Sequence, residues 1–82
     1  MDRVAVVISG VLGIPPESVV DDTSPDNVKK WDSLAHLNIV MALEAEFQLA
    51  LSPEEAMEML SVGLIRTILR EHGVNYAEKI NP

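Results

Sequence analysis

The stretch that decides the fold reads Trp31-Asp32-Ser33-Leu34-Ala35-His36-Leu37-Asn38-Ile39-Val40-Met41-Ala42-Leu43-Glu44-Ala45-Glu46-Phe47-Gln48. It contains neither glycine nor proline, and its leucine, methionine, alanine and glutamate residues all favour helix. Asp32 or Ser33 can accept hydrogen bonds from the first free backbone N–H groups of such a helix. The sequence therefore predicts a helix over residues 31–48 with a serine at its N-terminus.

On a helical wheel this segment carries two separate apolar stripes. The stripe suited to a core contains Ile39, Val40, Leu43 and Phe47. The stripe on the other arc contains Leu34, Leu37 and Met41, with Asn38, Glu44 and Gln48 within or beside it. An apolar island with a polar rim indicates a docking surface. The alternative is that both stripes are buried because the helix is central in a small bundle, and the pattern alone does not decide between them.

Composition and charge limit the classes of partner. A chain of 82 residues with 48% hydrophobic residues is expected to form one globular domain, and the absence of cysteine excludes disulfides and thiolate metal sites. The formal net charge of −7 argues against nucleic acid or an anionic membrane and favours a basic protein surface as partner. No lysine or arginine lies between Trp31 and Ile65, whereas this stretch holds Asp32, Glu44, Glu46, Glu54, Glu55 and Glu58.

The residues before the central helix predict one more helix and a long connection. The stripe Val4, Val7, Ile8 and Val11 predicts a first helix, which Gly13 ends, and Gly10 is expected to mark a close helix contact. The connection over 14–32 is expected to contain a short turn within 17–20 and to be anchored by Val19, Val20, Val28 and Trp31. A calcium loop is disfavoured, because Asp26 stands where an EF-hand needs glycine and Asp32 where it needs glutamate.

The N-terminal segment also bears on localisation. It is too short and too interrupted to span a membrane, and it lacks the features of a signal peptide. A cytoplasmic protein is therefore expected.

Two further helices are predicted after the central one. Ser52-Pro53-Glu54-Glu55 is a capping-box start for a short helix over 53–60, whose inward residues are expected to be Ala56, Met59 and Leu60. Ser61 can cap a last helix that ends at Gly73. Its inward residues are expected to be Val62, Ile65, Ile68 and Leu69, with Arg66 and Arg70 facing solvent. The predicted fold is an all-α four-helix bundle over 1–74, with three main helices, a short third helix, a long loop between helices 1 and 2, and a flexible tail over 75–82.

An ordered set of segments gives a family resemblance. It consists of Leu12-Gly13-Ile14-Pro15-Pro16-Glu17, Asp32-Ser33-Leu34, Met41-Ala42-Leu43-Glu44, Glu46-Phe47, and Glu55-Ala56 to Ser61-Val62. In this order and spacing, over roughly residues 3 to 72, the chain resembles an acyl carrier protein. Asp-Ser-Leu alone is a weak motif, but the ordered set is specific.

The resemblance implies that Ser33 receives 4′-phosphopantetheine from coenzyme A through a phosphopantetheinyl transferase. The thiol of that arm would then hold an acyl group as a thioester, and Asp32 would flank the site. A freestanding monomeric carrier without catalytic activity is expected, serving a fatty acid, polyketide or other dedicated acyl pathway. Its partners would be acyl-loading, elongating or acyl-transferring enzymes with basic docking surfaces. The expected docking residues are Leu34, Leu37, Met41, Glu44, Glu46 and Met57.

Several positions depart from the familiar pattern. Ala35 and Asn38 stand where fatty-acid-synthesis carriers often place acids, and Ala45 interrupts a run of glutamates. These departures favour a dedicated pathway with more apolar contact. Lys30-Trp31 replaces the Gly-Gly pair frequent in peptidyl carriers, which makes an aminoacyl cargo less favoured.

Three alternatives stay open beside the carrier. Ser33 could serve only as a helix cap, and the domain could be a helical protein-interaction module without the arm. A serine hydrolase that uses His36 as its base is disfavoured because no G-x-S-x-G elbow is present. His36 is expected instead to be a half-buried packing residue on the Ile39 side.

Overall fold

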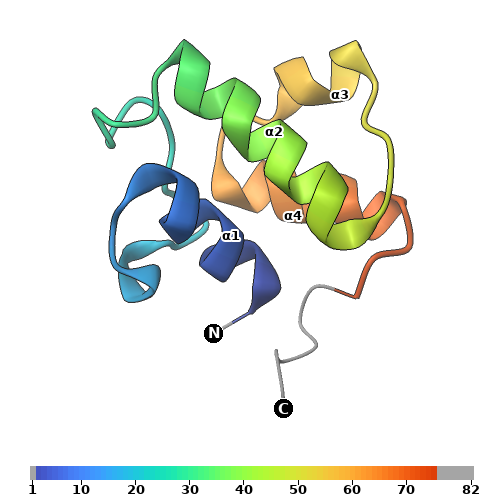
Figure 1. Cartoon of the computed structure of the whole chain (residues 1–82), viewed down its shortest axis with the longest axis horizontal. Coiled ribbons are helices and arrows are strands. Elements are labelled where there is room, and N and C mark those ends of the chain that lie inside the picture. The colour runs from blue at the N-terminus through green and yellow to red at the C-terminus, as the bar shows by residue number, and fades with distance from the viewer. Residues whose placement is uncertain (1, 76–82) are drawn as a thin grey trace.

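Residues 2–75 fold into four α-helices and one short 3₁₀ turn, and Figure 1 shows how the helices are arranged. These elements are α1 (Arg3–Leu12), η1 (Pro16–Ser18), α2 (Ser33–Phe47), α3 (Pro53–Glu58) and α4 (Val62–Glu71). The computed structural model describes residues 2–75, and that range contains no strand. The predicted all-α fold with a long connection between the first two helices is confirmed. Apart from Asn75, the predicted tail lies outside the described residues.

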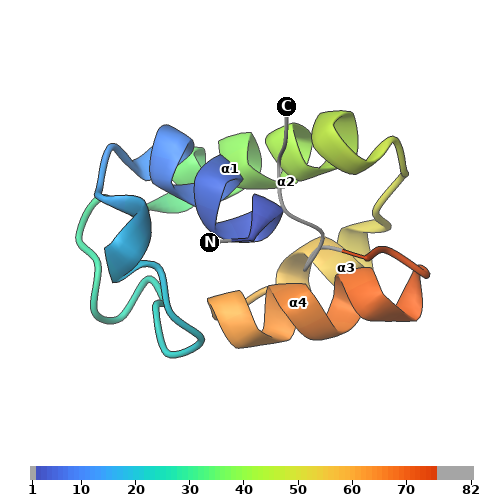
Figure 2. The same ribbon diagram turned by 90° about the horizontal axis from the view of Figure 1, so that it is seen from below.

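The helices form two layers, with α1 and α2 on one side and α4 with α3 on the other (Figure 2). The connection between α1 and α2 closes one end and is bonded to the start of α4. The carbonyl oxygen of Thr23 accepts from the Val62 N–H (2.9 Å), and that of Asp21 accepts from the Gly63 N–H (3.0 Å). A Cβ added at Gly63 would lie 3.4 Å from the Asp21 carbonyl oxygen. The long loop is therefore held in place just before the residues that lead into α2.

The core is aliphatic apart from Trp31, which is only 2% exposed. On α2, Ile39, Val40 and Leu43 are buried, and Phe47 packs against the core from its edge. Leu34, Leu37 and Met41 are instead 67%, 54% and 57% exposed. The structure thus decides the question that the pattern left open: only one of the two stripes on α2 is buried.

Two predictions about the first third of the chain are wrong. Gly10 makes no close helix contact, since a Cβ added there would meet nothing within 4 Å. Val20 does not anchor the loop but is 51% exposed, whereas the predicted anchor Val19 is buried and Thr23, which was not predicted, is buried as well. The Thr23 hydroxyl accepts from the Val20 N–H (2.9 Å) and donates to the Ser18 carbonyl (3.2 Å). A polar residue therefore fills the anchoring position because its hydroxyl is satisfied locally.

Two predictions about the last third are also wrong. Leu60 does not face inward but is 62% exposed, because α3 ends at Glu58 and the helical spacing no longer applies. Arg66 does not face solvent, since its guanidinium forms ion pairs with Asp2 and Asp21 and its side chain is largely buried. None of the helices within residues 2–75 is long and apolar enough to cross a membrane.

Candidate functional site

Asp32, and not Ser33, caps the N-terminus of α2. The Asp32 carboxylate accepts from the Ala35 N–H (2.8 Å). Ser33 is the first helical residue and is exposed, and its hydroxyl has no hydrogen-bond partner among residues 2–75. The interpretation of Ser33 as a plain capping serine is therefore wrong. The serine that the sequence singled out offers an accessible oxygen to another molecule.

The backbone around Ser33 favours a negatively charged substituent. The first N–H groups of a helix have no intrahelical acceptor, and the helix dipole places a partial positive charge there. In α2, a helix of 15 residues, the cap occupies only the Ala35 N–H. The N–H groups of Ser33 and Leu34 therefore remain available to an anion bonded to the Ser33 oxygen.

A largely apolar pocket of about 460 Å³ opens beside Ser33. Its walls come from the end of the long loop, the first turn of α2, and α3 with the residues that follow it. The lining residues are Pro25, Trp31, Asp32, Ser33, His36, Met57, Met59 and Leu60. The site therefore combines an exposed hydroxyl, the N-terminus of a helix and an apolar recess.

His36 is half-buried, as predicted, and both of its ring nitrogens are engaged. Nδ1 accepts from the Trp31 Nε1–H (3.1 Å), and Nε2 lies 2.8 Å from the Ala56 carbonyl oxygen. A general base needs a free lone pair directed at the hydroxyl it deprotonates. Neither nitrogen of His36 offers one to Ser33, which argues against a serine–histidine nucleophile.

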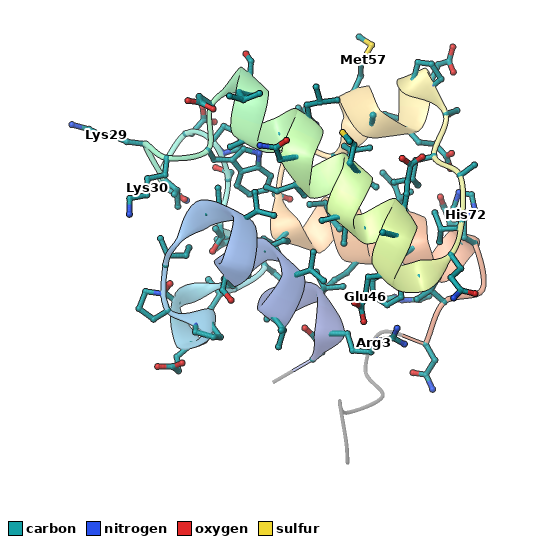
Figure 3. The ribbon with its side chains drawn as sticks, in the orientation of Figure 1. Arg3, Lys29, Lys30, Glu46, Met57 and His72 are labelled. Atoms are coloured by element: carbon teal, nitrogen blue, oxygen red, sulfur yellow. The ribbon has the colours of Figure 1, made fainter. Side chains whose placement is uncertain are left out.

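The exposed apolar side chains of α2 and α3 form one surface next to this pocket. We define the docking surface as Leu34, Leu37, Met41 and Met57. Met57 is the most exposed of them, at 75%, and Figure 3 shows its side chain projecting from α3 away from the bundle. Four large apolar side chains in solvent, beside an exposed serine, are typical of a surface that another protein covers.

Glu44 and Glu46, the acidic residues predicted to take part in docking, are engaged inside the molecule. The Glu44 carboxylate accepts from the Leu51 N–H (2.9 Å) in the loop after α2. The Glu46 carboxylate forms an ion pair with Arg3 of α1 (3.0 Å), and these two residues meet at the end of α2 far from Met57 (Figure 3). Both carboxylates therefore stabilise contacts of the fold, and their role in docking stays a prediction.

The short helix α3 has no fully buried residue of its own, but Ala56 packs against the core and Met59, which follows the helix, is fully buried. Ser52 and Glu55 form the predicted capping box. The Glu55 carboxylate also lies 2.7 Å from His72 Nε2, after the end of α4. The backbone hydrogen bond from Ser52, followed by the bond to His72, holds the pKa of Glu55 below its usual range.

The sequence singled out Ser33 and Asp32 as candidate site residues, and their role stays a prediction, but it did not indicate the pocket beside them. Leu60 was assigned to the core and Pro25 to an ordinary loop, although both line the recess. The hydrogen bond between Trp31 and His36 spans the boundary between loop and helix, where helical spacing does not apply. The only sequence signal for this bond is that Trp31 and His36 lie close together, on either side of the capping Asp32.

Comparisons with known proteins agree with this geometry. A family model described as "Phosphopantetheine attachment site" matches residues 2–69. The chain belongs to the acyl carrier protein family. It is 32% identical to the acyl carrier protein of Chlamydia trachomatis serovar L2 over 71 residues, which cover 87% of this chain and 92% of that protein. It is also 32% identical to the acyl carrier protein of Thermosynechococcus vestitus over 62 residues, 76% of each chain.

Members of this family are carriers with covalently attached 4′-phosphopantetheine, and the chain shares this cofactor. The residues at the start of α2 fit a phosphodiester, because an exposed hydroxyl stands beside two available N–H groups. The apolar pocket next to it fits the uncharged part of the arm. When the arm is attached, its terminal thiol holds an acyl group as a thioester.

Proposed function

We propose that the chain carries acyl intermediates on 4′-phosphopantetheine attached to Ser33 and presents them to partner enzymes of a fatty acid, polyketide or other dedicated acyl pathway. The observation that carries this proposal is the state of Ser33: its hydroxyl is exposed and unbonded because Asp32 takes the capping role. A serine that capped its own helix would lose that bond on modification. Modification of Ser33 breaks no hydrogen bond of its hydroxyl within residues 2–75.

Loading requires a separate phosphopantetheinyl transferase. The Ser33 oxygen forms the new bond to the β-phosphorus of coenzyme A, the pyrophosphate linkage breaks, and adenosine 3′,5′-bisphosphate leaves with the electron pair. The hydroxyl proton goes to a base on the transferase, since His36 has no free nitrogen for it. The N–H groups at the start of α2 then stabilise the charge of the phosphodiester.

The docking surface supports partners that present an apolar recess with a basic rim. Leu34, Leu37, Met41 and Met57 supply the apolar contact. Asp32, Glu54 and Glu58 are exposed carboxylates near this surface that can attract a basic partner and orient it. Two competing functions remain: a carrier of aminoacyl cargo, and a protein-interaction module without the arm. The loading experiment distinguishes a carrier from the interaction module.

The test is the intact mass of the purified chain before and after incubation with coenzyme A, magnesium and a broad-specificity phosphopantetheinyl transferase. We expect a gain of one phosphopantetheine group in the wild type and none in Ser33→Ala. The matched control is Ser61→Ala, because Ser61 also stands at the start of a helix but uses its hydroxyl to accept from the Leu64 N–H. Ser61→Ala should load normally. A folded wild type that gains no mass, or gains it in Ser33→Ala, would overturn the proposal.

A further inference from the structure

Both histidines of the chain are bonded to α3. His36, on α2, bonds the Ala56 carbonyl of α3 through Nε2 (2.8 Å). His72, just after α4, bonds the Glu55 carboxylate through its own Nε2 (2.7 Å). Ala56 packs against the core and Met59, at the end of α3, is fully buried, and the two histidines add a side-chain hydrogen bond each to these apolar contacts.

The partners of His36 specify one protonation state. An indole N–H can only donate, so Nδ1 must carry the lone pair that accepts from Trp31. A carbonyl oxygen can only accept, so Nε2 must carry the proton directed at Ala56. Both bonds exist together only in the neutral imidazole with its proton on Nε2. A second proton on Nδ1 would face the Trp31 N–H and break that bond.

These bonds join the two walls of the pocket beside Ser33. Trp31 forms the wall on the side of the loop, and its ring is nearly parallel to that of His36, with 20° between the planes and 6.1 Å between the centroids. Met57 and Leu60 belong to α3 and the segment after it, on the other side of the pocket. His36 is thus bonded to both sides. Met57 also belongs to the docking surface, so the same ring fixes α3 relative to the exposed stripe of α2.

We propose that His36 is a positioning residue: in its neutral form it joins Trp31 to the Ala56 carbonyl and so sets the placement of α3 and α2 against the loop, and its protonation breaks the bond to Trp31 and loosens the loop side of the pocket beside Ser33. The effect on docking rests on the proposed carrier function, whereas the effect of His36 protonation on the structure does not. The sequence alone predicted this role for neither histidine.

The other charged groups near His36 are exposed, line the same pocket or are bonded to other partners. Asp32 lines the same pocket from the start of α2. On α3, Glu55 is bonded to Ser52 and His72, and Glu58 is exposed. In the loop before Trp31, Lys29 is exposed and Lys30 donates to the Gly13 carbonyl (3.5 Å). The lowered pKa of Glu55 keeps that carboxylate ionised throughout the range in which histidines titrate.

The structural test uses the unmodified protein and its one tryptophan, Trp31. Its fluorescence is recorded between about pH 8 and about pH 5, the range in which histidine changes charge. We expect a pH-dependent change in emission in the wild type and in His72→Gln. It should be lost in His36→Gln, whose amide keeps a donor and an acceptor but does not titrate. An equal pH response in His36→Gln and the wild type would overturn the proposal.

A second measurement keeps this test decisive if His36→Gln fails to fold. In the wild type at about pH 8, nitrogen NMR of the imidazole rings should show His36 protonated at Nε2 alone. The Trp31 indole N–H resonance should shift together with the His36 nitrogens as the pH is lowered. A His36 ring protonated at Nδ1 at about pH 8 would contradict the proposed hydrogen bonds.

The functional test measures loading kinetics with a phosphopantetheinyl transferase. We expect His36→Ala to raise the KM for the carrier several-fold with little change in kcat, and His36→Gln to restore most of the loss. The matched control, His72→Ala, removes the other contact to α3 without touching the pocket beside Ser33, and a smaller rise in KM is expected. Absence of loading in the wild type would instead disprove the carrier function. Normal loading with an unchanged KM in His36→Ala would overturn the inference alone.

Discussion

The two halves of α2 differ in what their side chains contact. From Ser33 to Met41 the outward residues are an unbonded serine and three exposed apolar side chains. From Glu44 to Phe47 the outward residues are tied to the rest of the molecule. Glu44 accepts from the Leu51 N–H, and Glu46 pairs with Arg3, whose guanidinium also lies 4.6 Å from the centre of the Phe47 ring.

This difference shows that acidic residues on the helix are not automatically docking residues. The carboxylates of the second half satisfy N–H groups and a cation of the fold, so a partner would have to replace those contacts in order to use them. The first half carries almost no charge but exposes the surface whose burial would drive association. Partner recognition should therefore depend on apolar contact near Ser33 and less on ion pairs along the whole helix.

The largest expected effect compares the buried and exposed stripes directly. Leu43 is 0% exposed and Leu37 is 54% exposed, although they lie on the same helix. We expect Leu43→Ala to lower the free energy of unfolding by about 2–5 kcal/mol, because it removes buried methyl groups and leaves a cavity. Leu37→Ala should change it by less than about 0.5 kcal/mol. Urea denaturation followed by circular dichroism measures both, and equal losses would show that the exposed stripe also belongs to the core.

The second-largest expected effect is on the efficiency with which the transferase loads Ser33. Met41→Glu places a carboxylate in the centre of the apolar docking surface, where a partner would have to desolvate it. We expect the kcat/KM for loading Ser33 to fall about tenfold, equivalent to about 1.4 kcal/mol, with little change in stability. Met41→Leu is the control that keeps the apolar contact and should load normally. A large drop in melting temperature for Met41→Glu would mean that the two stripes had been assigned the wrong way round.

The sequence predicted what depends on local chemistry. The capping box at Ser52 and Glu55 and the cap at Ser61 are confirmed, because a cap involves residues three positions apart. The core stripe of α2 is confirmed for the same reason, since helical spacing fixes which residues share a face. The choice of which stripe faces solvent came from the family resemblance, because a wheel does not reveal what packs against it.

What the sequence could not predict depends on residues far apart in the chain. Arg66 sits on the outward face of α4 by spacing, but Asp2 and Asp21, which lie far from it in the sequence, form ion pairs with it. The contact between His36 and the Ala56 carbonyl joins two helices across 20 positions of sequence. Leu60 was misplaced because the end of α3 is set by its docking against α4 and not by a breaker residue. The pocket beside Ser33 is built from such contacts, so the sequence did not predict it, whereas Ser33 was a candidate from its local motif.

A smaller effect separates the roles of two adjacent residues at the start of α2. Asp32→Ala removes the acceptor for the Ala35 N–H and should cost about 1 kcal/mol of stability, the usual loss for a helix cap. Ser33→Ala removes a hydroxyl without a partner and should change stability by only a few tenths of a kcal/mol, while abolishing loading. Thermal unfolding of both variants tests this. A cost for Ser33→Ala as large as that for Asp32→Ala would make the serine structural.

The smallest expected effect tests the second half of α2. Glu46→Gln removes one charge but leaves the Glu46 carbonyl, which accepts from the Arg3 guanidinium (3.0 Å), and the contact between Arg3 and Phe47. Because exposed ion pairs contribute little, we expect a loss of about 0.2–1 kcal/mol at low salt, which should shrink at about 1 M salt. A double-mutant cycle with Arg3→Gln isolates the pair. If Glu46→Gln instead slowed loading of Ser33 while the coupling to Arg3 was zero, the carboxylate would be a docking group, and the two halves of α2 would share one function.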